Sequence, residues 1–158
     1  MTPFAINLIL AFVWAALNGG IGLVSLIVGF TIGYGVIFIL QPLFGTSRYC
    51  GKIYDALQLV LYFFYELVVS SLKVAWDVLT PMHKSQPAVV AVPIEAATDA
   101  EITVLANLVS LTPGSLSIDI SEDRSHLLVH AMFVDDPELF KAEIKHGMEK
   151  RLLEAMRS

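Results

Sequence analysis

The chain has 158 residues and a formal net charge of −5, and 56% of its residues are hydrophobic. Residues 1–47 contain no Asp, Glu, Lys or Arg, whereas residues 85–158 have the mixed, acidic composition of a water-soluble domain. An acidic domain repels phosphate backbones, which disfavours nucleic-acid binding. The single cysteine, Cys50, excludes an internal disulfide and a cysteine-based zinc framework.

The uncharged N-terminal stretch is too long for one membrane crossing, because a hydrocarbon layer of ~30 Å takes roughly 20 helical residues. Its main interruption is Asn18-Gly19-Gly20. The stretch therefore predicts two hydrophobic helices, at about residues 3–18 and 21–43, joined by a tight hairpin. A cleaved secretory signal is disfavoured, because the basic n-region is missing and a second apolar segment of full spanning length follows.

Gly29 and Gly33 form a small-xxx-small pair on the second apolar segment. Such pairs let another helix approach closely. We interpret the two glycines as candidates for packing against a neighbouring subunit, and packing within the chain's own hairpin is the alternative.

The positions of the first basic residues predict how the chain is oriented across the membrane. Arg48, Lys52 and Lys84 favour the cytoplasmic side, and the turn at Asn18 carries no charge. The N-terminus would then be cytoplasmic and the hairpin turn would face outward.

Residues 55–79 predict an amphipathic helix with a narrow polar stripe. This helix either lies in the membrane interface with the stripe toward water, or crosses the bilayer as a third membrane helix with the stripe against partner proteins. We favour the interface. Glu66, Lys73 and Asp77 are candidates for polar contacts to neighbouring subunits. The simpler interpretation is a solvated helix face, and no proton relay is assigned to it. The stripe consists of Asp55, Gln58, Tyr62, Glu66, Ser70, Lys73 and Asp77.

Thr80-Pro81 ends this helix, so residues 1–80 form a membrane domain, 81–87 a linker and 88–158 a small domain. The patterns in the small domain predict the order β-α-β-β-α, which is that of a ferredoxin-like sandwich without its last strand. The expected elements are a strand at 88–94, a helix at 98–110, strands at 115–120 and 126–134, and a helix at 139–156 that is entered through Asp136-Pro137.

Catalytic patterns are missing from the sequence. His126 and His130 lie on one strand, about 13 Å apart, which is too far for one metal ion. Neither a nucleophile elbow nor a P-loop is present. We therefore expect no enzyme, no cofactor and no metal site.

Two blocks of the small domain carry a family resemblance. Ala106 to Ser121, ANLVSLTPGSLSIDIS, resembles the signature of the E subunit of multisubunit Mrp-type sodium/proton antiporters. Leu127 to Met132, LLVHAM, followed by Asp135 to Glu138, is similar to that family's second block. The arrangement of apolar helices, linker and α+β tail is also similar to that family over nearly the whole chain.

The resemblance implies an accessory, multi-pass subunit of a hetero-oligomeric complex in the bacterial plasma membrane. That complex exchanges protons for sodium or another monovalent cation, and its large subunits, similar to those of respiratory complex I, carry the proton path. This chain would support assembly, stability or coupling, with its C-terminal domain in the cytoplasm. Docking-loop candidates are Asn107, Thr112, Pro113 and Gly114, with a purely structural turn as the alternative. A membrane-tethered ligand-sensing module is the second functional interpretation.

Overall fold

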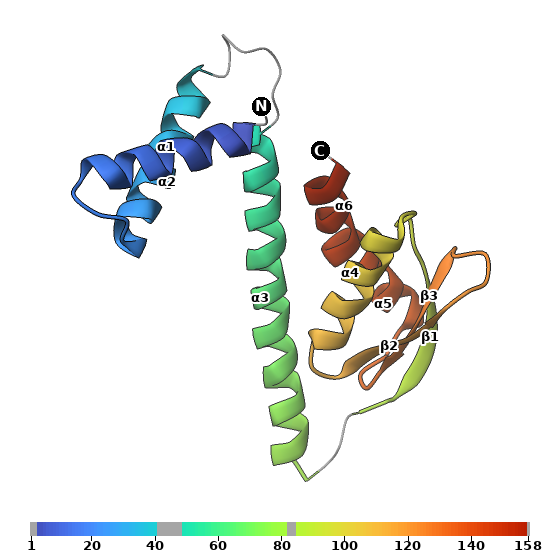
Figure 1. The fold of residues 1–158 in the computed structure, drawn as a ribbon. Coiled ribbons are helices and arrows are strands. Elements are labelled where there is room, and N and C mark those ends of the chain that lie inside the picture. Colours follow the sequence, from blue (N-terminus) through green and yellow to red (C-terminus); the bar gives the residue numbers. More distant parts are fainter. Residues whose placement is uncertain (1–2, 41–48, 82–84, 158) are drawn as a thin grey trace. The chain divides into compact units, whose positions relative to one another are not determined.

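The computed structural model describes residues 3–40, 49–81 and 85–157 (Figure 1). The predicted basic residues Arg48 and Lys84 lie outside the described residues. The chain divides into two compact units, Met1–Ile53 and Tyr54–Ser158, and each is considered by itself.

The first unit is a hairpin of two apolar helices, α1 (Pro3–Leu17) and α2 (Leu23–Leu40). The turn between them has glycine in the left-handed region, because Gly19 has a φ of 84°. The N–H of Gly20 donates to the carbonyl of Ala15 at 3.3 Å, which satisfies one carbonyl at the end of α1 as in a Schellman motif. The helical hairpin predicted from the sequence is confirmed for the described residues, and residues 41–43 of the second prediction lie outside them.

A third helix, α3, runs from Tyr49 to Leu79 over 31 residues. It begins six residues before the predicted start at Asp55, and it ends before Pro81 as predicted. By length and composition alone, α2 and the Gly51–Leu79 part of α3 could each cross a membrane, and α1 is shorter, with 15 residues. Length therefore does not decide between the two placements of α3.

The second unit contains a three-stranded antiparallel sheet in the order β1-β3-β2. Its strands are β1 (Ala88–Pro93), β2 (Ser115–Ile120) and β3 (His126–Ala131). The last strand ends three residues earlier than predicted. The structure also shows a β-bulge between Ser117 and Asp119, which the alternating pattern did not predict.

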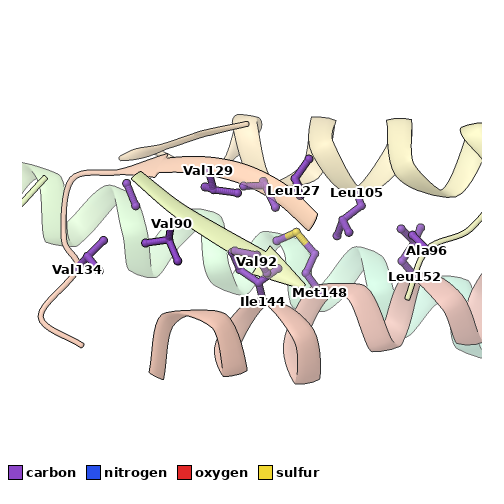
Figure 2. Packing of buried hydrophobic residues seen from close by; sticks show 12 residues of the cluster. Val90, Val92, Ala96, Leu105, Leu127, Val129, Val134, Ile144, Met148 and Leu152 are labelled. Atoms are coloured by element: carbon purple, nitrogen blue, oxygen red, sulfur yellow. The ribbon is translucent and has the colours of Figure 1, made fainter. Parts of the chain in front are cut away.

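Helix α4 (Asp99–Leu111) and a long C-terminal helix cover one face of this sheet. The first turn of α4 has the predicted capping box, in which the Thr98 side chain accepts from the N–H of Glu101. Between them the strands and helices enclose one apolar core (Figure 2). Its most buried members include Val92, Leu105, Val129 and Leu152.

The C-terminal helix is not regular. It consists of α5 (Pro137–Glu143), a π-helical segment η2 (Ile144–Glu149) and α6 (Lys150–Arg157). Apolar residues recur here at every fourth position, and on an α-helix such a series drifts by about 40° per step. A π-helical turn holds more residues and compensates the drift, so that Ile144, Met148 and Leu152 all stay buried.

Candidate functional site

The close contacts of the first unit are made by small residues. Gly29 and Gly33 are the buried residues of α2, and they lie against α1. A Cβ atom at Gly29 would come within 2.9 Å of the Ala11 carbonyl oxygen and within 2.8 Å of Trp14 Cβ. A Cβ atom at Gly33 would collide with the Asn7 side chain. The structure therefore uses both glycines inside the hairpin, and their contact with a neighbouring subunit stays a prediction.

In the second unit, the polar stripe of α3 faces the chain's own C-terminal domain. Leu59, Tyr62 and Phe63 pack against the apolar core of that domain. Glu66 and Ser70 are half-buried, and Asp77 is buried. Neither placement expected from the sequence included this arrangement, in which most of the stripe meets the chain's own domain and Lys73 stays exposed.

The opposite side of α3 is apolar and exposed. We call it the apolar face. Its residues are 47% to 80% exposed, a level that a water-soluble helix normally reserves for polar side chains. The apolar face consists of Tyr54, Leu57, Val60, Leu61, Phe64, Tyr65, Val68, Leu72, Trp76, Val78 and Leu79.

A close contact between α3 and the domain joins Tyr62 to the π-helical segment and to the start of α6. The ring of Tyr62 lies under the guanidinium of Arg151, whose Cζ is 4.0 Å from the ring centroid. The hydroxyl of Tyr62 lies against Gly147, where a Cβ atom would collide with it. Arg151 Nη1 is held by the carbonyl of Gly147 at 2.8 Å. These three residues fix the π-helical segment against α3 through a cation–π contact and a close backbone approach.

Sequence reasoning missed Gly147 and Arg151. A glycine inside a run of good helix formers costs about 1 kcal/mol relative to alanine, so it often marks a packing requirement. Gly147 could therefore have been identified from the sequence. Nothing in the sequence indicates that Arg151 lies over the ring of Tyr62, which is 89 residues away.

Several of the predicted candidates line one cleft of about 110 Å³ between α3 and the domain. Glu66 and Lys73 come from α3, and Thr112, Pro113 and Gly114 come from the loop after α4. Gly114 has a φ of 88°, and a Cβ atom there would contact Val74 of α3 at 3.5 Å. The predicted docking loop thus contacts this chain's third helix.

Two further candidates, Asp77 and Asn107, lie elsewhere. Asp77 lines a second, wider cleft, and the other residues there include Lys73, Asp135, Asp136 and Glu143. Asn107 is exposed on α4 and is not among the described residues that line either cleft. Within the described part of the chain, no group of three or more His, Cys, Asp or Glu side chains could hold a metal ion.

One ion pair, between Arg157 and Glu101, lies at the end of α6. Arg157 Nε is 2.7 Å from Glu101 Oε1, and its Nη2 donates to Glu101 Oε2 at 2.9 Å. The same carboxylate accepts from the N–H groups of Thr98 and Ala97. The guanidinium and these amides hold the pKa of Glu101 far below its usual range. The contact joins the first turn of α4 to the last turn of α6.

Comparison with known proteins identifies the family. The family model described as "Na+/H+ ion antiporter subunit" matches residues 7–155. The chain belongs to this family. Members include the Na(+)/H(+) antiporter E subunit of Alkalihalophilus pseudofirmus, which is 34% identical over 94% of both chains. The corresponding E subunit of Bacillus subtilis is 34% identical over 96% of both chains. The resemblance found in the two blocks of the small domain is therefore confirmed.

The solved structures that are similar to this chain include chains of two complexes. A chain in the Mrp complex from Dietzia sp. DQ12-45-1b is 30% identical, with a TM-score of 0.51, and the match covers 63% of this chain and 93% of that chain. A chain of the membrane-bound sulfane sulfur reductase, an archaeal respiratory membrane complex, has a TM-score of 0.57 at 19% identity over 96% of this chain and 98% of that one. The second match shows similarity of fold alone.

Proposed function

We propose that this chain is an accessory membrane subunit of a multisubunit Na+/H+ antiporter complex. The observation that carries the proposal is a family match that spans both the apolar hairpin and the C-terminal domain. Helices α1 and α2 contain no Asp, Glu, Lys or Arg, and an ion path needs polar groups near the middle of the membrane. Partner subunits supply that path, and this chain supports assembly, stability or coupling.

The placement of α3 is part of this proposal. The helix lies in the membrane interface with its apolar face in the acyl boundary and its polar stripe on the C-terminal domain. Crossing the bilayer would force the half-buried Glu66 to a depth that costs about 2.5 to 3.5 kcal/mol. It would also draw the charged domain that covers the stripe toward hydrocarbon. The apolar hairpin α1–α2 then supplies the crossings.

The division of the chain follows from this placement. Residues 1–80 form the membrane domain, 81–87 the linker and 88–158 a cytoplasmic domain. The strand order β1-β3-β2 supports a ferredoxin-like fold in which the place beside β1 lacks its fourth strand. The bacterial plasma membrane is the compartment that this architecture and the family relatives suit.

The candidate residues have different roles in this proposal. Gly29 and Gly33 close the hairpin, and the surface that they shape is presented to neighbouring subunits. Lys73 is exposed at the edge of the cleft and is the best placed for a polar contact with a partner. Glu66 and Asp77 hold the stripe against the domain. The loop Thr112 to Gly114 positions the domain on α3.

Co-purification tests the assignment to a complex. A tagged full-length chain, expressed with the other subunits and extracted in detergent, should bring down several larger hydrophobic subunits. Everted vesicles without this chain should lose Na+/H+ exchange in proportion to the loss of assembled complex. Recovery of the chain as a homodimer without membrane partners would refute the proposal.

Substitution of Lys73 tests the polar contact. Lys73→Ala should lower the yield of intact complex, whereas Lys52→Ala, the matched change of an exposed lysine on the same helix, should not. Equal yields for both variants would leave Lys73 without a role at a partner surface.

Thiol labelling tests the placement of α3. A single cysteine introduced at Ser121 in a Cys50→Ser background should react with an impermeant maleimide in everted vesicles and not in intact cells. The opposite pattern would mean that α3 crosses the membrane.

A further inference from the structure

The cationic side chains of the C-terminal domain differ in how closely they pair with a carboxylate, and those with a carboxylate oxygen within 3.0 Å are called committed. Four of them have a carboxylate oxygen within 3.0 Å, whereas Lys150 is 4.0 Å from Glu154 and Arg151 has no ion-pair partner among the described residues. These two cations are adjacent in sequence at the start of α6. The committed pairs are Arg124–Asp99, Lys141–Glu138, Lys145–Glu95 and Arg157–Glu101.

Both uncommitted cations line the same hollow. It has a volume of about 220 Å³, and its walls are Gln58 of α3, His146, Lys150, Arg151 and Glu154. Every one of these side chains is polar, and the two cations, Lys150 and Arg151, outnumber the one carboxylate, that of Glu154. The hollow is therefore suited to a small, polar group with negative charge.

The position of Arg151 is fixed before any ligand arrives. Its Nη1 donates to the carbonyls of Gly147 and His146 at 2.8 and 3.3 Å, and its Cζ lies 4.0 Å from the Tyr62 ring centroid. A guanidinium has five N–H donors in a planar fork. The donors on Nε and Nη2 remain for an acceptor, and a phosphate oxygen matches their geometry.

The hollow borders the apolar face of α3. Gln58 Nε2 donates to the hydroxyl of Tyr54 at 2.7 Å, so the polar wall and the apolar face are in contact. Leu57 and Leu61, one residue before and three residues after Gln58, are 53% and 60% exposed. A free inorganic anion would use only the hollow. A ligand with a charged head and an apolar body would use both surfaces.

We propose that the hollow binds the phosphate of an anionic phospholipid, with an acyl chain along the apolar face beside Leu57 and Leu61. Lys150 and Arg151 contact the phosphate, and Gln58 and Glu154 accept hydrogen bonds from headgroup hydroxyls. The site gives the third helix a fixed lipid at headgroup depth, at a point where the net acidic chain would otherwise repel an anionic leaflet. It rests on the proposed interfacial placement of α3.

Native mass spectrometry of the full-length chain in detergent tests the site, with phosphatidylglycerol or phosphatidylcholine added at equal concentration. The wild type should retain phosphatidylglycerol preferentially. Lys150→Glu should weaken that retention by about tenfold, because it replaces an attractive charge at the phosphate with a repulsive one. The matched control is Lys141→Glu, which makes the same change of charge at a lysine outside the hollow and should retain the lipid.

Equal loss in both variants would mean non-specific attraction, and no loss in Lys150→Glu would mean that the hollow is not the site; either result overturns the proposal. Displacement of phosphatidylglycerol by inorganic phosphate at the same concentration would overturn the lipid assignment in favour of a soluble phosphate. An unchanged thermal transition of Lys150→Glu shows that the fold is retained, and Lys150→Ser provides a second variant. Lipid retention in detergent does not depend on the orientation of α3, so its failure is distinguishable from a failed topology test.

Discussion

The hairpin α1–α2 and the C-terminal domain are each stabilised internally, and the two use different kinds of contact. In the hairpin, close approach of two backbones at Gly29 and Gly33 makes the contact. In the domain, buried aliphatic side chains form the core. A capping box begins α4, and the Arg157–Glu101 ion pair joins α4 to α6. In a bilayer, moving an apolar side chain from lipid into a helix contact gains no hydrophobic free energy. Helices there associate through close van der Waals packing instead. Water drives apolar burial in the domain.

The largest expected effect breaks the hairpin. Gly29→Val places a Cβ atom within 2.9 Å of the Ala11 carbonyl and within 2.8 Å of Trp14 Cβ, where backbone cannot move aside. We expect a destabilisation of about 3 kcal/mol, at the upper end for overpacking. SDS titration followed by Trp14 fluorescence in a Trp76→Phe background measures it. Gly35→Ala is the control, because a Cβ atom there meets no atom within 4 Å.

The second effect tests whether the domain holds α3. Gly147→Ala brings a Cβ atom against the Tyr62 hydroxyl, which can move, so we expect a smaller destabilisation of about 1–2 kcal/mol. Hydrogen exchange of residues 54–79 should become faster. Tyr62→Phe removes the colliding oxygen and should restore part of the protection in the double variant, because the ring carbon Cζ would still lie 2.9 Å from the new Cβ atom. If protection in Gly147→Ala equals that of the wild type, the contact does not hold the helix.

The third effect is a dependence of stability on pH. It distinguishes the domain from the hairpin, because helices α1 and α2 contain no Asp, Glu, Lys or Arg. Arg157 and the amides of Thr98 and Ala97 lower the pKa of Glu101 in the folded chain. Its stabilising contribution is therefore complete above the unfolded pKa of about 4.3 and is lost as the pH falls toward the folded pKa. Glu101→Gln should unfold at lower temperature at pH 7, and the difference from the wild type should shrink below about pH 4. A difference that is constant with pH would contradict this ion pair.

The smallest effect is confined to the turn between β2 and β3. Asp123 accepts hydrogen bonds from the hydroxyls of Ser121 and Ser125, which lower its pKa to about 2. Carbon-13 NMR titration of the Asp123 carboxyl group should show this value. Ser121→Ala should raise it, with little change in stability because the turn is exposed. An ordinary pKa of about 3.9 in the wild type would contradict the turn geometry.

Much of the domain could be predicted from short-range chemistry. The helix starts at Thr98 and Asp136 follow from capping side chains, and the strands follow from alternation. The bulge at Ser117 and Asp119 was missed because alternation alone does not register an extra residue in one strand. The π-helical segment was missed although the four-residue spacing of Ile144, Met148 and Leu152 was visible, because that spacing was taken as ordinary helix.

The partner of the polar stripe was the main gap in the prediction of the site. A helical pattern shows which side of α3 is polar, and it does not show what covers that side. The structure fills the gap through Tyr62, which contacts Arg151 and Gly147 far along the chain. Contacts of this range depend on the folded arrangement of the domain. The sequence could predict the stripe, and only the fold could show that the domain itself meets it.

The π-helical turn at Ile144–Glu149 also bears on how this helix tolerates changes of length. Because such a turn accommodates one residue more than an α-helical turn, the loss of a single residue inside it converts the segment to regular helix and leaves α5 and α6 in their original rotational phase. A deletion in the α-helical residues between Pro137 and Leu152 would instead turn Leu152 by about 100° relative to the start of the helix. Between these two residues, the π-helical segment is thus the place where the loss of one residue leaves the packing of the domain unchanged.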